Sequence, residues 1–109
     1  MIENILILDV ETQGLDEKKG KLLEIGCIFY NIPTRSIHHQ VSFLMKEDSN
    51  PVEHINHISV ESLKTVLPEC TIMGYGFVCQ LLFSCDDIVA HNAAFDRKWL
   101  MALNDGMKE

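Results

Sequence analysis

Two acidic residues close the first apolar run of the sequence, and their spacing is suited to holding a metal ion. Ile5–Val10 is short and rich in isoleucine, as a strand buried on both faces would be, and Asp9 and Glu11 lie at its end. Side chains two residues apart in a strand point to the same face, so these two carboxylates should project side by side. A divalent cation would relieve their mutual repulsion, and magnesium often takes only one or two carboxylates.

A third carboxylate, Asp96, follows a second short apolar run, Ile88–Ala90. Asn92 is a good N-cap, so we expect a helix from Ala93 to about Asn104, with Asp96 one turn inside it. The positive N-terminal end of a helix favours the ionised form of a nearby carboxylate. The face of this helix that packs on a sheet would carry Phe95, Trp99 and Ala102.

The elements that precede this helix follow from the hydrophobic pattern. Ile5–Val10, Leu22–Tyr30 and Ser36–Leu44 are typical of strands, and 12–21 is a charged, glycine-containing loop. Pro33 cannot continue a ladder, so Asn31–Thr34 should be a turn. We therefore expect these three strands to form an antiparallel meander.

Helices are expected after the meander. The polar segment Lys46–His57 should be a connecting loop, and Ser59 should cap a short helix, Val60–Val66, that ends before Pro68. Apolar residues surround most of the helical wheel of Cys70–Phe83, which predicts a buried helix. Ile88–Ala90 should then add a short buried strand. This order indicates a mixed α/β layer fold.

Composition limits the classes of function. The chain has 109 residues, enough for one small domain, with 47% hydrophobic residues and a formal net charge of -7. A basic protein that coats phosphates is excluded, although bound cations allow an acidic protein to handle nucleic acid. The four cysteines and five histidines fit no zinc spacing. With no signal peptide and no membrane-length apolar run, we expect a cytoplasmic protein with reduced thiols and no membrane association.

Two motifs together resemble those of DEDD-type 3′–5′ exonucleases, the group that includes polymerase proofreading subunits. Leu8–Leu15 resembles their first motif, D-x-E-T-T-G-L, with Gln13 where threonine is usual. Ile88–Asp96 resembles their second motif, a strand followed by H-N-A-x-F-D. Glu24–Gly26 matches the E-I-G segment of the second strand, and Asn56–Leu63 is more weakly similar to the linking helix that often begins H-G-I-T. The motifs occur in the family's order over essentially the whole chain.

The resemblance implies a ribonuclease H-like fold, with one parallel strand added to the antiparallel meander. Asp9, Glu11 and Asp96 would be three of the four acidic residues that organise two Mg²⁺ or Mn²⁺ ions across the scissile phosphate. One metal would activate the attacking water and the other would stabilise the departing 3′ oxygen. The substrates would be 3′ ends of single-stranded DNA or RNA, and the products nucleoside 5′-monophosphates.

The same resemblance assigns substrate contacts to the loop after the first motif. Thr12 and Leu15 match positions that touch the terminal nucleotide, Leu15 through an apolar contact with the base. The alternative for Leu15 is an ordinary loop-packing residue. Without the family context, Asp9 and Glu11 would be an exposed strand end and Asp96 a solvated helix residue.

Other polar residues are expected to be structural or solvated. His91 and Asp96 form the only H-x4-D of the chain, a spacing that the family's third motif uses for its general base and fourth carboxylate. We expect His91 to be structural, because the surrounding residues are those of the second motif. Lys18, Lys19 and Lys21 should lie in a solvated loop. His38 and His39 should lie on a strand near a sheet edge.

The family's third motif is not found after Asp96. That motif supplies the last aspartate and a histidine or tyrosine for proton transfer, and nothing in 97–109 resembles it. We therefore expect residues 1–109 to form the N-terminal part of one exonuclease domain, a C-terminally incomplete version of the fold. Three alternatives stay open: a truncated active exonuclease, a degenerate module that binds nucleic acid or a protein without cutting, and a half completed by a partner chain. The exposed sheet edge left by a missing strand would favour self-association.

Overall fold

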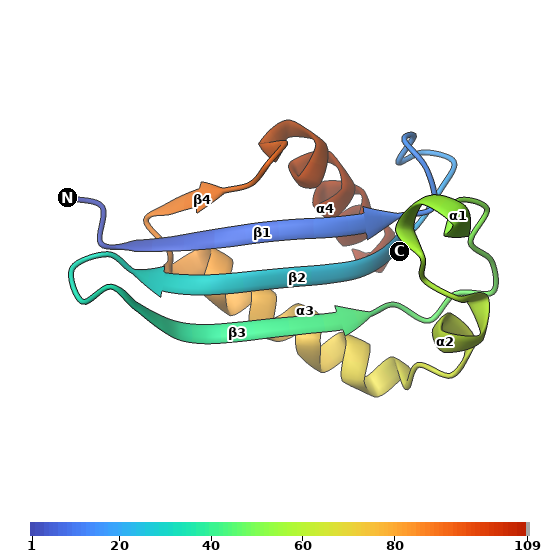
Figure 1. The fold of residues 1–109 in the computed structure, drawn as a ribbon, viewed down its shortest axis with the longest axis horizontal. Coiled ribbons are helices and arrows are strands. Elements are labelled where there is room, and N and C mark those ends of the chain that lie inside the picture. The colour runs from blue at the N-terminus through green and yellow to red at the C-terminus, as the bar shows by residue number, and fades with distance from the viewer. Residues whose placement is uncertain (109) are drawn as a thin grey trace.

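Four strands form a single mixed sheet in the computed structural model, which describes residues 1–108 and, for 102–108, the backbone alone. Its strands are β1 Asn4–Thr12, β2 Leu22–Asn31, β3 Ser36–Leu44 and β4 Asp87–Val89. The strand order is β3-β2-β1-β4, with β1–β2 and β2–β3 antiparallel and β1–β4 parallel (Figure 1). The predicted antiparallel meander with one added parallel strand is confirmed.

The long helices cover one face of this sheet. α3 (Pro68–Ser84) and α4 (Ala93–Lys108) lie behind the strands in Figure 1, and the short helices α1 (Glu53–Asn56) and α2 (Val60–Lys64) lie at one end of the sheet. Leu6 and Leu8 of β1 are buried against the helices, whereas Ile7, on the opposite face, is 39% exposed. The expectation that the first strand is buried on both faces is therefore wrong, because the described residues supply only one covering layer.

The connection between β3 and α3 follows the predicted caps with two differences. Ser59 caps α2 as expected, its side chain accepting a hydrogen bond from the backbone N–H of Ser62 at 3.1 Å. The predicted loop 46–57 contains the four-residue helix α1, which ends at His57 in a left-handed conformation with φ of 60°. Pro68 was expected only to end the preceding helix, but it is the first residue of α3. At this position its missing N–H removes no helical hydrogen bond, and its fixed φ suits the first turn.

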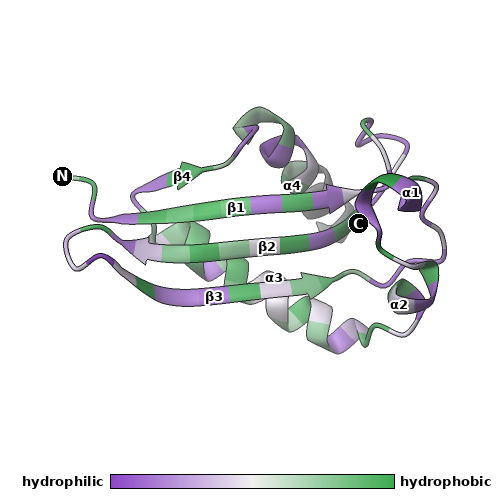
Figure 2. Cartoon of the chain, in the orientation of Figure 1, coloured by the Kyte–Doolittle hydropathy of each residue, from purple (hydrophilic) through white to green (hydrophobic). Residues whose placement is uncertain are grey.

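α3 is not the buried helix that its composition predicts. Only Val78 and Leu81 are buried, while Met73 and Phe83 on the outer side are 74% and 95% exposed. Apolar residues occur on both sides of this helix, but only its inner side meets the sheet (Figure 2). β4 is likewise exposed rather than buried, since it forms the edge of the sheet and its Ile88 is 43% exposed.

Gly74 sets how closely α3 approaches the sheet. A Cβ added at this position would lie 2.8 Å from Cδ1 of Phe43 on β3, closer than a real Cβ contact. Gly76, two residues further along, has nothing within 4 Å of such an atom. The two glycines of α3 therefore differ: Gly74 allows a close helix–sheet contact, and Gly76 lies in open space.

The core runs between the sheet and the inner sides of α3 and α4. Its members are Leu6, Leu8, Val10, Leu22, Ile25, Cys27, Phe29, Met45, Val78, Leu81 and Trp99. All four cysteines are free thiols, and burial raises the pKa of Cys27 to about 11. Among the described residues, no helix combines the length and the apolar character that crossing a membrane requires.

The start of α4 is formed as the sequence predicts. The Asn92 side chain accepts a hydrogen bond from the backbone N–H of Phe95 at 3.2 Å, which caps the helix. Trp99 is 1% exposed and packs against Phe95, with ring centroids 6.0 Å apart. The side chain of Ala102, predicted on the same face, lies outside the described residues. The cap and the Trp99 contact together fix the helix turn that carries Asp96.

Candidate active site

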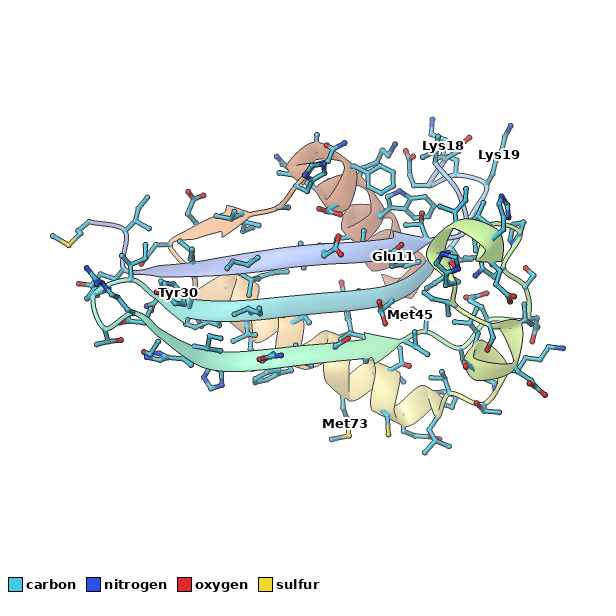
Figure 3. The ribbon with its side chains drawn as sticks, viewed as in Figure 1. Glu11, Lys18, Lys19, Tyr30, Met45 and Met73 are labelled. Carbon is cyan, nitrogen blue, oxygen red and sulfur yellow. The ribbon has the colours of Figure 1, made fainter. Side chains whose placement is uncertain are left out.

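The first two carboxylates lie at the end of β1 on the face that the helices leave open. Asp9 is exposed and Glu11 partly exposed, and both belong to the set of side chains that alternates with the buried Leu8 and Val10. Figure 3 shows Glu11 near the end of the strand, next to the short helices. The register between β1 and β2 shifts between Glu11 and Thr12, which is an irregularity of the kind that a β-bulge produces. The predicted side-by-side projection agrees with this alternation.

The partner strand adds two features that were not predicted as parts of the site. Asp9 lies opposite Gly26, and Glu11 lies opposite Glu24. Gly26 has no side chain, which leaves a hollow of about 230 Å³ beside Asp9. Glu24 brings another carboxylate next to Glu11. The sequence signal was present in the E-I-G segment, but only the antiparallel register identifies which residues its members face.

Asp96 approaches β1 along the part of its edge that β4 does not cover. β4 pairs with Ile5–Ile7 only, and α4 lies beside β1 beyond that point (Figure 1). The backbone amide of Val10 lies close enough to the Asp96 carboxylate to lower its pKa. Asp96 is only 4% exposed. The Asp96 carboxylate therefore lies beside the Val10 amide of β1, where β4 would pair with β1 if β4 were longer.

The pKa of Asp96 is nevertheless raised above the usual aspartate value of 3.8. Burial is the largest cause and the charge of Asp9 the second, and these outweigh the opposing effects of His91 and the Val10 amide. A largely apolar pocket of about 490 Å³ between α3, β4 and α4 borders Asp96. The favourable effect expected from the helix N-terminus is therefore not what sets the direction of this shift, because desolvation and repulsion by Asp9 prevail.

Glu11 is perturbed in the same direction. Its pKa is raised above the ordinary glutamate value of 4.5 by burial first, and then by the charges of Asp9, Glu24 and Asp96. Asp9 thus acts on both Glu11 and Asp96, which shows that the three predicted carboxylates share one electrostatic environment. Such mutual repulsion is typical of groups that hold a cation.

The donor set fits a hard divalent cation, although its members do not form a closed cage. Carboxylate oxygens are the ligands that Mg²⁺ and Mn²⁺ prefer, and repulsion among the three groups would be relieved by such an ion. Within residues whose side chains the structure describes, no three acidic, histidine or cysteine side chains are close enough together to hold a metal ion by themselves. Magnesium sites commonly use one or two carboxylates with water and phosphate completing the shell, so an open arrangement suits that ion. The roles of Asp9, Glu11 and Asp96 as metal ligands stay a prediction.

The raised pKa values predict how stability depends on pH without divalent metal. A carboxyl group whose pKa is higher in the folded protein contributes stability that is complete below its unfolded pKa and is lost as pH rises through its folded pKa. For Glu11 and Asp96 this loss begins above about pH 4 and ends above their raised values. The melting temperature of wild-type protein in EDTA should therefore fall, relative to that of Asp9→Asn, as pH increases from 4 towards neutrality.

The check is a pair of melting curves at matched ionic strength across that pH range. Asp9→Asn removes the second-largest cause of both raised pKa values and leaves burial unchanged, so its curve should be flatter but not flat. Parallel curves for the two proteins would contradict the shared environment of the three carboxylates.

Side-chain hydrogen bonds fix the main chain of the loop between β1 and β2. Gln13 accepts from the backbone N–H of Lys21 at 2.8 Å and donates to the Ser49 carbonyl at 2.8 Å. Asn56 donates to the Thr12 carbonyl at 3.2 Å. Gln13, which departs from the threonine usual in the motif, thus joins both ends of the loop to the segment after β3. From the sequence alone, Gln13 is only a departure from the motif.

The two predicted substrate-contact residues differ in exposure. Leu15 is 82% exposed, which excludes the loop-packing alternative and leaves its side chain available. Thr12 is nearly buried, and its hydroxyl donates to the Gly14 carbonyl. The structure therefore gives Thr12 a role in shaping the loop, while its contact with a nucleotide stays a prediction.

The lysines and histidines that are expected to be structural or solvated are exposed. Lys18 and Lys19 extend into solvent, as expected of a solvated loop (Figure 3), and Lys21 is exposed as well. His38 and His39 lie on β3 at the sheet edge as predicted. His91 is exposed, so no buried contact supports its predicted structural role, and its charge acts on Asp96.

Comparison with solved structures identifies the fold. The crystallographic structure of the nuclease domain of 3′hExo, a DEDDh family member, bound to rAMP, matches with a TM-score of 0.72 and 11% identity over 98% of this chain. SSB/Exonuclease I in complex with the inhibitor CFAM matches with a TM-score of 0.67 and 15% identity over 84% of the chain. Cell-death related nuclease 4 matches with a TM-score of 0.58 and 16% identity over 82%. No protein-family model and no curated protein sequence matches.

These neighbours confirm the predicted ribonuclease H-like fold, the fold of 3′-exonuclease domains. The sequence identities are low, so the fold is what the likeness establishes. This chain spans 60% of the length of the 3′hExo chain and 22% of the SSB/Exonuclease I chain.

Proposed function

We propose that this chain provides the metal-binding strand and helix of a 3′–5′ exonuclease that removes nucleoside 5′-monophosphates from single-stranded DNA or RNA ends. The observation that carries the proposal is the electrostatic coupling of Asp9, Glu11 and Asp96 at the end of the central strand. Burial and the charge of Asp9 raise the pKa values of Glu11 and Asp96 there, so these two carboxylates are costly to ionise. A divalent cation bound there would offset that cost and could also accept a phosphate oxygen.

The chemistry of the proposed site divides among the described residues. Asp9, Glu11 and Asp96 would hold Mg²⁺ or Mn²⁺, which when bound supplies charge stabilisation for the phosphate and its leaving oxygen. Asp96 is kept in place by the Asn92 cap and by the packing of Trp99. Its alignment therefore does not depend on substrate.

The likeness to nucleases supports the class of substrate. One neighbour is described as bound to rAMP, and another represents 3′-end specific recognition of a histone mRNA stem-loop by a 3′-exonuclease, with a TM-score of 0.59 and 12% identity. In this chain the exposed Leu15 offers an apolar surface for a terminal base. We propose that Leu15 contacts that base.

The direct test is digestion of 5′-labelled single-stranded DNA and RNA with Mg²⁺ or Mn²⁺. A ladder that shortens from the 3′ end, is absent with EDTA and is absent for Asp9→Asn supports the proposal. Asp48→Asn is the matched control, because Asp48 is an exposed aspartate outside the strand end. Metal-dependent binding without cleavage would favour a non-catalytic nucleic-acid module. Neither binding nor cleavage would reject the proposal.

Leu15→Ala tests the base contact. Shortening this side chain removes apolar area that only the bound state would bury, so KM should rise about tenfold with little change in kcat. The melting temperature should not change, because Leu15 is 82% exposed. Steady-state kinetics on a labelled oligonucleotide measure both constants. Leu67→Ala, which alters a 63% exposed leucine before α3, should leave KM unchanged, and an equal rise in both variants would contradict the contact.

A further inference from the structure

Lys98 of α4 contacts the loop that carries Leu15 at two points. Its Nζ lies 3.3 Å from Oε2 of Glu17, and it donates a hydrogen bond to the Leu15 carbonyl oxygen, also at 3.3 Å. Both partners lie in the loop between β1 and β2, about eighty positions away in the sequence. The contacts are made to the main chain of Leu15 and to the side chain of Glu17, two residues further on, so neither involves the Leu15 side chain.

The same turn of α4 supports the end of this loop. Trp99 lies against Gly20, where an added Cβ would be 3.3 Å from Cη2 of the indole ring. The Lys98 ammonium itself lies 5.3 Å from the centroid of the Phe95 ring, a favourable cation–π distance. Asp96 lies between Phe95 and Lys98 in the sequence. One helical turn therefore carries the candidate metal ligand and the residues on which the loop rests.

The loop is also held at its other side. Gln13, the first residue of the loop, is hydrogen-bonded to Lys21 and to Ser49. With Gln13 at its base and Lys98 at its middle, the main chain of Leu15 has a fixed position while its side chain points to solvent. Lys98 is 41% exposed and Glu17 20%. Pairs at such exposure add little to global stability, so the effect of Lys98 should be local.

We propose that Lys98 is a positioning residue, which sets the distance between Leu15 and Asp96 by clamping the loop to α4. The inference rests on the proposed function, in which Leu15 contacts the terminal base and Asp96 serves the scissile phosphate. Lys98 acts through the Leu15 carbonyl and Glu17. The placement of the terminal base relative to the scissile phosphate then depends on Lys98, a residue outside both motifs.

The KM and kcat of four variants separate this positioning role from the alternative that Lys98 binds a substrate phosphate directly. Lys98→Gln should raise KM about fivefold and leave kcat within twofold, and Lys98→Arg, which can still donate to both acceptors, should restore KM. Lys19→Gln removes the same charge from a solvent-facing lysine of the loop and should change KM less than twofold. Glu17→Gln is decisive: it should raise KM if Lys98 positions the loop, and lower KM if Lys98 binds phosphate directly.

Hydrogen exchange tests the clamp without substrate or activity. Amide exchange between Leu15 and Gly20 should accelerate about two- to fivefold in Lys98→Gln and stay at the wild-type rate in Lys19→Gln. Unchanged exchange in Lys98→Gln, or a lower KM in Glu17→Gln, would overturn the proposal. If the wild-type protein neither binds nor cleaves nucleic acid, the proposed function fails, and the exchange rates alone decide whether Lys98 clamps the loop.

Discussion

Asp96→Asn should make the metal-free protein more stable at neutral pH while reducing metal-dependent cleavage by about 10²–10³-fold. Asp96 is 4% exposed, and its pKa is raised by burial and by Asp9. Asparagine removes the poorly solvated charge and keeps an oxygen that can face the Val10 amide. Functional sites commonly hold such a conflict at a cost to stability, so relief by about 0.5–2 kcal/mol is expected.

Metal titration separates this prediction from general stabilisation. Mg²⁺ or Mn²⁺ should raise the melting temperature of the wild-type protein, since a ligand that binds only the folded state stabilises it. The same titration should have much less effect on Asp96→Asn. Asp48→Asn should behave like the wild type. A destabilised Asp96→Asn protein that still responds fully to metal would contradict a shared cation site.

Gly74→Val should lower the free energy of unfolding by about 3 kcal/mol, whereas Gly76→Val should change it by less than about 1 kcal/mol. Both substitutions place the same side chain in α3 and have the same helix propensity. They differ only in surroundings, because a Cβ at Gly74 would be 2.8 Å from Phe43 and one at Gly76 meets nothing within 4 Å.

Urea unfolding of the two variants measures the difference directly. The expected result is a large drop in the midpoint for Gly74→Val, with an m-value like that of Gly76→Val. A third variant, Phe43→Leu combined with Gly74→Val, should recover part of the loss by providing space. Equal midpoints for the two single variants would show that α3 can move away from β3 at little cost.

The strands and caps could be predicted because their causes are local. The apolar run Ile5–Val10, the Pro33 turn and the Asn92 cap depend on residues within a few positions of each other. Motif order then identified the ribonuclease H-like fold, which the structural neighbours confirm. The burial of α3 and β4 could not be predicted, because it depends on which other layers cover them. Apolar composition alone does not decide that, as the exposure of Phe83 and Ile88 demonstrates.

The roles of the candidate site residues stay predictions, whereas their electrostatic surroundings became visible only in the structure. Asp9, Glu11 and Asp96 were found from spacing and motif, but the net direction of the Asp96 pKa depends on burial and on the charge of Asp9. Glu24 required the strand register, and Lys98 required a contact across the whole fold. Such contacts have no periodic signature in a single sequence.

The hollow over Gly26 affects how many water molecules can lie beside Asp9 at the end of β1. The hollow of about 230 Å³ is lined by Asp9 on β1 and Ser42 on β3 and has room for several water molecules. A small, strongly hydrated ion at Asp9 could keep part of its aqueous shell on that side. A bulkier residue at position 26 would displace this water, and would thereby favour a larger cation that sheds its shell more readily.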